Sequence, residues 1–291
     1  MAAIILLVLK ASIILSVFAI GLKATFDDTT YLFRRPKQLV RPVVSMNVVM
    51  PVLALILGLT FDLHPALKIS LLAIAVSPVP PIFPNKAFKA GGTETYTIGL
   101  LVAAALLSVI LIPIAMKIVE RMSSVPLTMR PSGVFVTVLT TVLLPLLVGI
   151  GVRTLFPTFA ERIAKPLAVV SLVLLVVSAL PVLIGMGKAM FALVGDGTVV
   201  ILSLFACTGL AVGHFLGGGR QAGNRHTLAL ATATRHPAVA LTIGHANFPQ
   251  QRLPLVMMYL ILAFVWSTAY MAWAKRHEAA HAGETNQAVK A

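Results

Sequence analysis

Four prolines within one apolar segment limit the folds open to this chain more than any other feature. Residues 71–76 (LLAIAV) are typical of a membrane helix, and Pro78, Pro80, Pro81 and Pro84 follow directly. Proline lacks an N–H and clashes with the preceding turn, so no continuous helix crosses this stretch. A broken helix at membrane depth requires protein or a water-filled cavity to satisfy the freed backbone groups. Such breaks come in pairs in many transporters and mark the binding site, so we expect a second one.

The composition is that of a polytopic membrane protein. Hydrophobic residues make up 58% of the 291 residues and charged residues only 11%, whereas about 25% is usual in soluble domains. At about 20 apolar residues per span, the sequence predicts an all-α protein with nine transmembrane segments. We place these segments at residues 3–22, 38–59, 66–90, 96–119, 132–155, 166–187, 197–217, 225–247 and 253–274.

The segments form one predicted transmembrane domain, residues 1–275. Its first half covers about residues 1–122 and its second half about 130–275, while residues 276–291 form a loose cytoplasmic tail. With the N-terminus outside, fifteen of the 23 Lys and Arg residues fall on the cytoplasmic side and six outside. The positive-inside rule therefore predicts a multi-pass protein of the cell (inner) membrane with a cytoplasmic C-terminus.

The net charge of +14 indicates contact with the bilayer rather than with nucleic acid. The basic residues lie between apolar segments instead of along one face. Anionic lipids of the inner leaflet attract such loops. We therefore expect the lipid bilayer as a partner and no nucleic acid.

The second break is predicted in the eighth segment, which has the weakest hydropathy of the nine. Arg235-His236-Pro237 stands at its centre. Segments three and eight are five apart, so they run through the membrane in opposite directions. Two breaks in equivalent positions of oppositely oriented halves are typical of an inverted repeat with two crossing broken helices. The half-helix N-termini offer partial positive charge to anions, and the C-termini offer carbonyls to cations.

The order and spacing of several short stretches resemble the bile acid:sodium symporter family over nearly the whole chain. These stretches are Gly21-Leu-Lys with Phe33-Arg-Arg-Pro-Lys, Val49-Met-Pro51, Val76-Ser-Pro78, Leu143-Leu-Pro145 and Thr227-Leu-Ala-Leu. The resemblance implies a core domain that holds the crossing helices, a panel domain beside it, and organic anion substrates, usually moved with sodium. It also implies that this chain lacks the first of the ten helices common in the bacterial family.

The chain departs from the family where that family binds sodium. Aligned without gaps, Ala231 stands at the position of the family's sodium-binding Glu, Arg235 at that of Gln and His236 at that of Asn. In the third segment Gly-Gly-Thr becomes residues 79–81 (VPP), and the Ser-Asn pair becomes residues 83–84 (FP) or reaches Asn85 with a slip of one residue. All nine acidic residues fall in loops, near segment ends or in the tail. A hard cation normally needs anionic or many carbonyl oxygens, so sodium is a doubtful partner.

Polar residues of the two breaks, together with Asn47 of the second segment, are the candidate substrate-binding residues. They are Arg235, His236, Thr234, Thr232, Asn85 and Asn47. A central Arg is costly in a membrane and rarely lacks a role; Arg235 would anchor an anion, replace sodium as a fixed cation, or cap carbonyls structurally. His236 is the proton-coupling candidate, because its unperturbed pKa lies near 6.5; the alternative is a hydrogen-bonded core histidine. The two threonines have a structural alternative too, a bond back to their own helix.

The function predicted from these features is secondary transport of small organic anions by alternating access, without the family's usual sodium site. Two alternatives remain: sodium-coupled symport of bile-acid-like or carboxylate substrates at a non-standard site, and a non-transporting binding or sensor paralogue. An enzyme is not expected, since no H-E-x-x-H or G-x-S-x-G motif is present. No metal or other cofactor is predicted.

Overall fold

All regular structure in the described residues is helical. The structure, a computed structural model, describes residues 2–80, 82–123, 131–194, 197–218, 222–247 and 252–290, so Pro81 lies outside it. The first half contains α1 (Ala2–Gly21), α2 (Phe26–Thr30), α3 (Pro36–Pro42), the π-helical η1 (Val43–Val49), α4 (Met50–Thr60), α5 (Pro65–Val76), α6 (Phe83–Lys89) and α7 (Glu94–Ser123). The second contains α8 (Pro131–Val138), the π-helical η2 (Leu139–Leu143), α9 (Leu144–Leu155), α10 (Pro157–Phe191), α11 (Thr198–Leu216), α12 (Ala222–Ala233), α13 (Pro237–Asn247) and α14 (Arg252–Lys290).

The helices confirm the polytopic membrane fold. Within the described residues, six helical stretches are long and apolar enough to span a bilayer: 36–60, 94–118, 132–155, 157–191, 198–216 and 253–277. Two shorter apolar helices cover residues 7–21 and 65–76. The remaining predicted segments are therefore the first, which is α1, and the third and eighth, which are divided.

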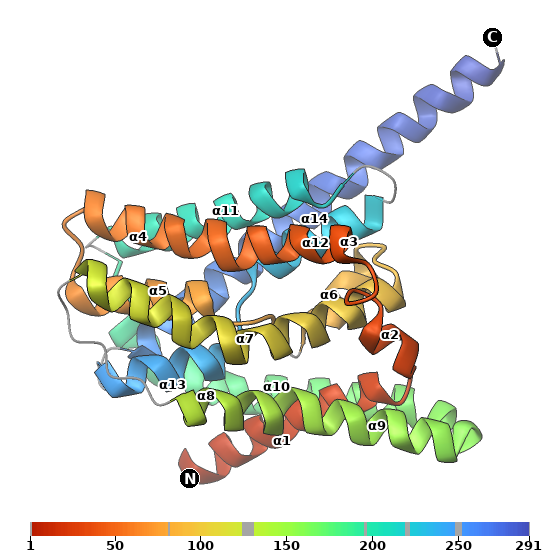
Figure 1. The fold of residues 1–291 in the computed structure, drawn as a ribbon, viewed down its shortest axis with the longest axis horizontal. Helices are drawn as coiled ribbons and strands as arrows, with labels where there is room; N and C mark the ends of the chain where they lie inside the picture. The colour runs from red at the N-terminus through yellow and green to blue at the C-terminus, as the bar shows by residue number, and fades with distance from the viewer. Residues whose placement is uncertain are drawn as a thin grey trace.

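The helices pack in two groups. In one, α1 lies against both α9 and α10, along the lower edge of Figure 1. In the other, α11 packs on α12 and α14, while α5 packs on α4 and α13. A large buried apolar cluster fills the second group, and two smaller clusters lie around α1. This division corresponds to the core and panel expected from the resemblance.

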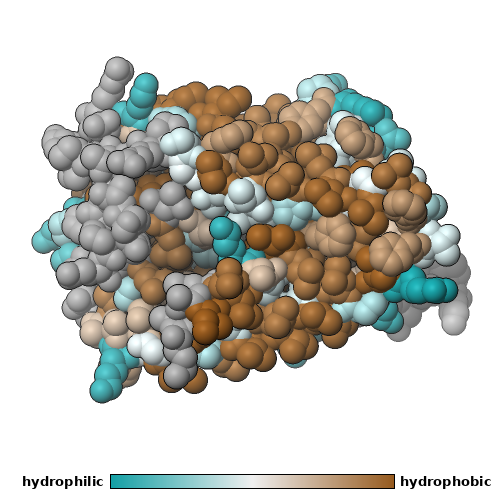
Figure 2. Space-filling view, turned by 90° about the horizontal axis from the view of Figure 1, so that it is seen from below, coloured by the Kyte–Doolittle hydropathy of each residue, from teal (hydrophilic) through white to brown (hydrophobic). Residues whose placement is uncertain are grey.

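The outer surface of the α1, α9 and α10 group is suited to lipid. Along α10, apolar side chains such as Val173, Val177 and Ile184 are exposed. Figure 2 shows this face largely in brown, with hydrophilic residues gathered mainly toward two opposite edges. A soluble monomer rarely exposes so large an apolar area, whereas a bilayer covers it.

Both predicted helix breaks are present. Helix α5 ends at Val76 and α6 begins at Phe83, so the chain is not helical through most of the proline-rich stretch. Helix α12 ends at Ala233 and α13 begins at Pro237, which leaves Arg235 and His236 in the gap. Proline at the start of α13 is compatible with a first helical turn, where its missing N–H has no intrahelical partner to lose.

Two π-helical stretches, which the sequence analysis did not predict, also follow from proline. A proline stands two residues after the end of each stretch. Pro51 follows the stretch 43–49, and Pro145 follows the stretch 139–143. Neither proline can donate a hydrogen bond to the carbonyl four residues earlier. The helix accommodates this loss by widening locally, and such π-helical turns are frequent at functional sites.

Two boundaries differ from the sequence prediction. The segment expected at 166–187 extends over 157–191, because Pro157 suits the first turn of α10. The tail expected to be loose from residue 276 instead continues α14 to Lys290. Its Ala, Glu, Gln and Lys residues are good helix formers, which explains the difference.

Small residues allow the two neighbouring helices α11 and α12 to approach closely. A Cβ atom added to Gly213 would lie 2.5 Å from the Cα of Ala229 and 2.6 Å from the carbonyl oxygen of Leu228. Such contacts are typical of membrane helix interfaces, where packing rather than the hydrophobic effect holds helices together.

We predict opposite effects for two glycine substitutions. Gly213→Ala pushes α12 away from α11 and lowers stability by about 1–3 kcal/mol, the usual cost of overpacking. Gly185→Ala in α10, where an added Cβ meets nothing within 4 Å, leaves stability unchanged or raises it through better helix propensity. Thermal unfolding of the purified variants in detergent measures both. Equal effects of the two variants would contradict the close packing.

Candidate functional site

The two helix breaks are in direct contact. The backbone N–H of His236 donates to the carbonyl oxygen of Pro78 at 2.8 Å, and Arg235 Nη1 donates to the carbonyl oxygen of Ser77 at 3.2 Å. Two stretches about 160 residues apart in sequence are thereby joined by one hydrogen bond between backbone groups and one from a side chain to a backbone carbonyl. Each break supplies partners for polar groups that the other has freed, which is what the membrane interior requires.

Arg235 is the central residue of this junction. Its side chain is 1% exposed and is among the largest fully buried side chains. Its Nη2 donates to the carbonyl oxygen of Met46 at 3.2 Å, within the π-helical stretch η1. Its Nε has no hydrogen-bond partner, and no carboxylate of the described residues pairs with it. Arg235 therefore introduces a fixed positive charge that nearby carbonyl dipoles, rather than an anion, stabilise.

The carbonyls bound by Arg235 belong to helix ends and to a distorted helix. Ser77 caps the C-terminus of α5, where the helix dipole is negative. Met46 lies in η1, whose widened turn exposes carbonyl groups. Carbonyl oxygens of this kind are ligands for hard cations. The guanidinium caps both carbonyls, which is one of the alternatives given by the sequence.

His236 faces a different partner. It is fully buried, and its Nε2 lies 3.2 Å from Thr141 Oγ1 in η2. Its Nδ1 is buried without a partner. The break in segment eight is thus linked to both π-helical stretches. Arg235 contacts η1 and His236 contacts η2.

The two threonines both form hydrogen bonds within their own helix. Thr234 Oγ1 donates to Leu230 O at 2.6 Å, and Thr232 Oγ1 donates to Leu228 O at 2.8 Å. Thr232 Oγ1 also lies 3.0 Å from Ser45 Oγ in η1. Both hydroxyls are buried. The structural alternative for the threonines, a bond back to their own helix, is the one observed.

Asn85 and Asn47 are not joined to this group. Both side chains are half-buried, Asn85 in α6 and Asn47 in η1. None of the hydrogen bonds given for the described residues connects either asparagine to Arg235 or His236. The structure therefore brings together four of the six predicted residues.

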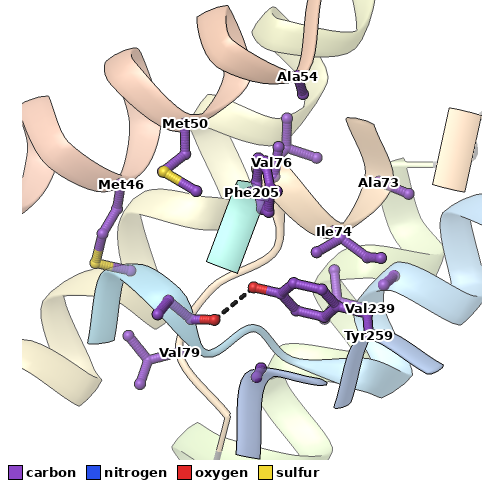
Figure 3. Close-up of a cluster of buried hydrophobic side chains, with 14 of the residues drawn as sticks. Met46, Met50, Ala54, Ala73, Ile74, Val76, Val79, Phe205, Val239 and Tyr259 are labelled. Carbon is purple, nitrogen blue, oxygen red and sulfur yellow. Dashed lines mark hydrogen bonds between the residues drawn. The ribbon is translucent and has the colours of Figure 1, made fainter. Parts of the chain in front are cut away.

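Tyr259 in α14 completes the junction, although the sequence analysis did not single it out. Its hydroxyl donates a short hydrogen bond to the carbonyl oxygen of Ala233, the last residue of α12 (Figure 3). Its ring packs edge-on against Phe205 at a centroid distance of 5.9 Å. Figure 3 shows the ring beside Ile74 of α5 and Val239 of α13. The tyrosine therefore caps one half-helix and fills the core beside it.

Three other residues that contact the junction residues were also not identified from the sequence, and the reason is the same for each. Ser45, Met46 and Thr141 lie in apolar segments without any unusual local pattern. Their signal is the proline that follows each stretch, at 51 and 145, which indicates a distorted helix with freed carbonyls. Recognition of that signal would have predicted two distorted helices, although not their contact with the breaks.

The described part of the chain buries no carboxylate. Its buried polar and charged residues are Ser, Thr, His and the single Arg235. Ala231, at the position of Glu in the resembled family, is fully buried and supplies no ligand. The site can therefore attract an anion and offers a cation only carbonyl and hydroxyl oxygens.

Comparisons with known proteins agree with the fold. The model of the Sodium Bile acid symporter family matches residues 11–193, more than half of the chain. An uncharacterized sodium-dependent transporter, YocS of Bacillus subtilis (strain 168), is 26% identical over 158 residues, which cover 54% of this chain and 48% of that protein. The match thus spans about half the length of this relative. The family match ends beyond α10 and does not include the second break.

We predict that Tyr259→Phe lowers stability by about 1–3 kcal/mol, because it leaves the buried carbonyl of Ala233 unpaired. Thr268→Val is the control on the same helix: it also removes a hydroxyl, but one that is exposed and bonded only to its own helix at Phe264. Thermal unfolding in detergent distinguishes the two. A similar small effect of both changes would show that the Tyr259 hydroxyl does not cap α12.

Proposed function

The chain belongs to the Sodium Bile acid symporter family, and from this premise we propose that it is a secondary transporter of small organic anions that works without the family's usual sodium site. Arg235 supplies a permanent positive charge in the stretch where the resemblance places the family's sodium site. The carbonyl oxygens of Ser77 and Met46 bind this charge from two different segments. That pair of hydrogen bonds is the observation that carries the proposal.

The charge balance of the site supports an anionic substrate. Arg235 has no carboxylate partner in the described structure, and its Nε is unpaired. A buried, uncompensated charge is unfavourable, so an anion that approaches the junction gains electrostatic energy that is weakly screened there. Guanidinium groups also match the planar geometry of a carboxylate. The proposed substrate therefore carries a carboxylate or similar group.

Alternating access is proposed from the two-group architecture. Arg235 and His236 lie within the core group, enclosed by α4, α5, α11 and α14. The α1, α9 and α10 group packs chiefly within itself. A rigid movement of one group against the other exposes the junction to each side in turn, as in other transporters built around broken helices.

Sodium-coupled symport at a non-standard site is the second candidate. The similarity to YocS, a sodium-dependent transporter of Bacillus subtilis, favours it. In that case carbonyl and hydroxyl oxygens would coordinate the ion without a carboxylate. Against it stands the electrostatic repulsion between Arg235 and a second cation, several kcal/mol at about 4 Å and intermediate dielectric.

We predict uptake that does not require sodium. Purified protein in liposomes should take up radiolabelled mono- or dicarboxylates at similar rates when sodium is replaced by choline at constant ionic strength, because Arg235 already provides the cation. Proton coupling through His236 is tested in the same assay by an imposed pH gradient. If the histidine carries the proton, His236→Gln flattens the pH dependence of uptake. A steep and saturable requirement for sodium would refute the proposal in favour of the second candidate.

A second prediction concerns the shape of the cation. Arg235→Lys keeps the charge but cannot reach two carbonyls and an anion with one ammonium group. We expect uptake to fall at least about tenfold, the equivalent of one charge-assisted hydrogen bond. Arg162→Lys in α10, an exposed position, is the matched control and should transport normally. Wild-type uptake by Arg235→Lys would remove Arg235 from the binding site.

A further inference from the structure

A second electropositive region lies at one end of the core group, separate from Arg235. A cavity of about 640 Å³ opens where the connection from α2 to α3, the start of α7 and the loop between α11 and α12 meet. This is the right-hand end of the bundle in Figure 1, which the basic loops place in the cytoplasm. Two arginines and two tyrosines are among the lining residues, and none of the lining residues is acidic.

Arg35 contributes one charge that no carboxylate neutralises. Its guanidinium carbon lies 4.1 Å from the centre of the Tyr31 ring, a cation–π contact that fixes the plane of the group. The neighbouring Arg34, in contrast, pairs with Asp27 at 2.9 Å. Arg35 is therefore held in place while its N–H edges stay available to an anion in the cavity.

Arg41 contributes the second charge, and a glycine makes room for it. Gly218 has φ +81°, and a Cβ atom there would clash with Arg41 Nη1. Both the backbone conformation and the space require glycine. Arg225 donates from Nε to the carbonyl of the same glycine at 3.3 Å, so three arginines approach this end of the core.

The wall between the arginines contains a polar atom that the protein does not satisfy. Gln38 Oε1 is buried and has no hydrogen-bond partner, although Gln38 lines the cavity. Buried polar atoms are normally paired, and an amide oxygen can only accept, so Oε1 requires a donor from the cavity itself, such as a hydroxyl group of a bound ligand. Tyr96, which is 4% exposed, closes the inner side.

We propose that this cavity binds the phosphate group of a phosphomonoester. Arg35 and Arg41 supply two guanidinium groups suited to its oxygens, and the tyrosine hydroxyls supply neutral donors. Gln38 Oε1 accepts from a hydroxyl group of the organic portion. A phosphate fills only part of about 640 Å³, so the remaining space accommodates the organic portion. Two sources share this chemistry: a soluble phosphomonoester of the cytoplasm and the headgroup of phosphatidic acid.

The position of the cavity links such a ligand to the candidate transport site. Arg41 lies in α3, which continues into η1 and the Met46 carbonyl bound by Arg235. Asn224, another lining residue, lies in the first turn of α12, which ends two residues before Arg235. A ligand that contacts α3 and α12 together restrains the two helices on which the junction depends. Its binding should therefore raise the thermal stability of the whole protein.

The test measures binding rather than transport, so its outcome does not depend on the proposed function. Full-length protein in lipid-free detergent is titrated with glycerol 3-phosphate, and binding is followed by calorimetry and by thermal unfolding. We expect saturable binding that weakens with added salt, and little binding of lactate, which carries a single charge. Arg35→Gln and Arg41→Gln should each weaken binding about tenfold or more.

Two further variants separate a built site from general positive charge. Lys37→Gln removes an exposed charge from the same helix but does not line the cavity, so it should bind like the wild type. Gly218→Ala leaves the net charge unchanged but displaces Arg41, so it should weaken binding as Arg41→Gln does. Equal binding by wild type, Arg41→Gln and Gly218→Ala would overturn the proposal, as would no saturable binding of either phosphate source.

The source of the phosphate is decided in nanodiscs. If phosphatidic acid added to phosphatidylcholine nanodiscs competes with glycerol 3-phosphate, and Arg41→Gln abolishes the competition, the headgroup is the ligand. If glycerol 3-phosphate binds equally well with and without phosphatidic acid, the ligand is soluble. Both results support a phosphate site.

Discussion

The hydrogen bonds of Arg235 to two backbone carbonyls are the interaction on which the rest of the core depends. Without water, every backbone group freed by a helix break needs a partner. Arg235 bonds the end of α5 to η1, His236 bonds to Pro78, and Tyr259 caps α12. A buried guanidinium is costly by itself. Here it is retained because its removal would leave carbonyls from two segments unpaired in the same place.

Prolines cause both the helix breaks and the local distortions of the helices that contact them. Around Pro78 and Pro84 they stop a helix outright, while Pro51 and Pro145 only widen the helix before them. The widened stretches meet the broken ones, through Met46 with Arg235 and through Thr141 with His236. Polar groups freed by distortions far apart in sequence therefore pair with one another, and the junction requires all of these segments to pack together.

The proposed function rests on the permanence of the charge on Arg235. A sodium ion must be bound and released in each cycle, whereas Arg235 always remains. Under the proposed function there is no coupling to the sodium gradient, and net movement follows the substrate gradient or a proton gradient. The proposed phosphate cavity lies at the ends of the same helices that hold Arg235, where its occupant can stabilise the core without entering the transport site.

The sequence by itself determined the membrane-spanning class, the positions of both breaks and the central place of Arg235 and His236. These follow from local chemistry: apolar length, the missing N–H of proline and the rarity of a charge in an apolar segment. The contacts of the π-helical stretches with the breaks, and the partners Met46, Thr141 and Tyr259, were decided only by the tertiary structure. Which carbonyl a buried donor reaches depends on how distant helices pack, and no local pattern in the sequence records that distance.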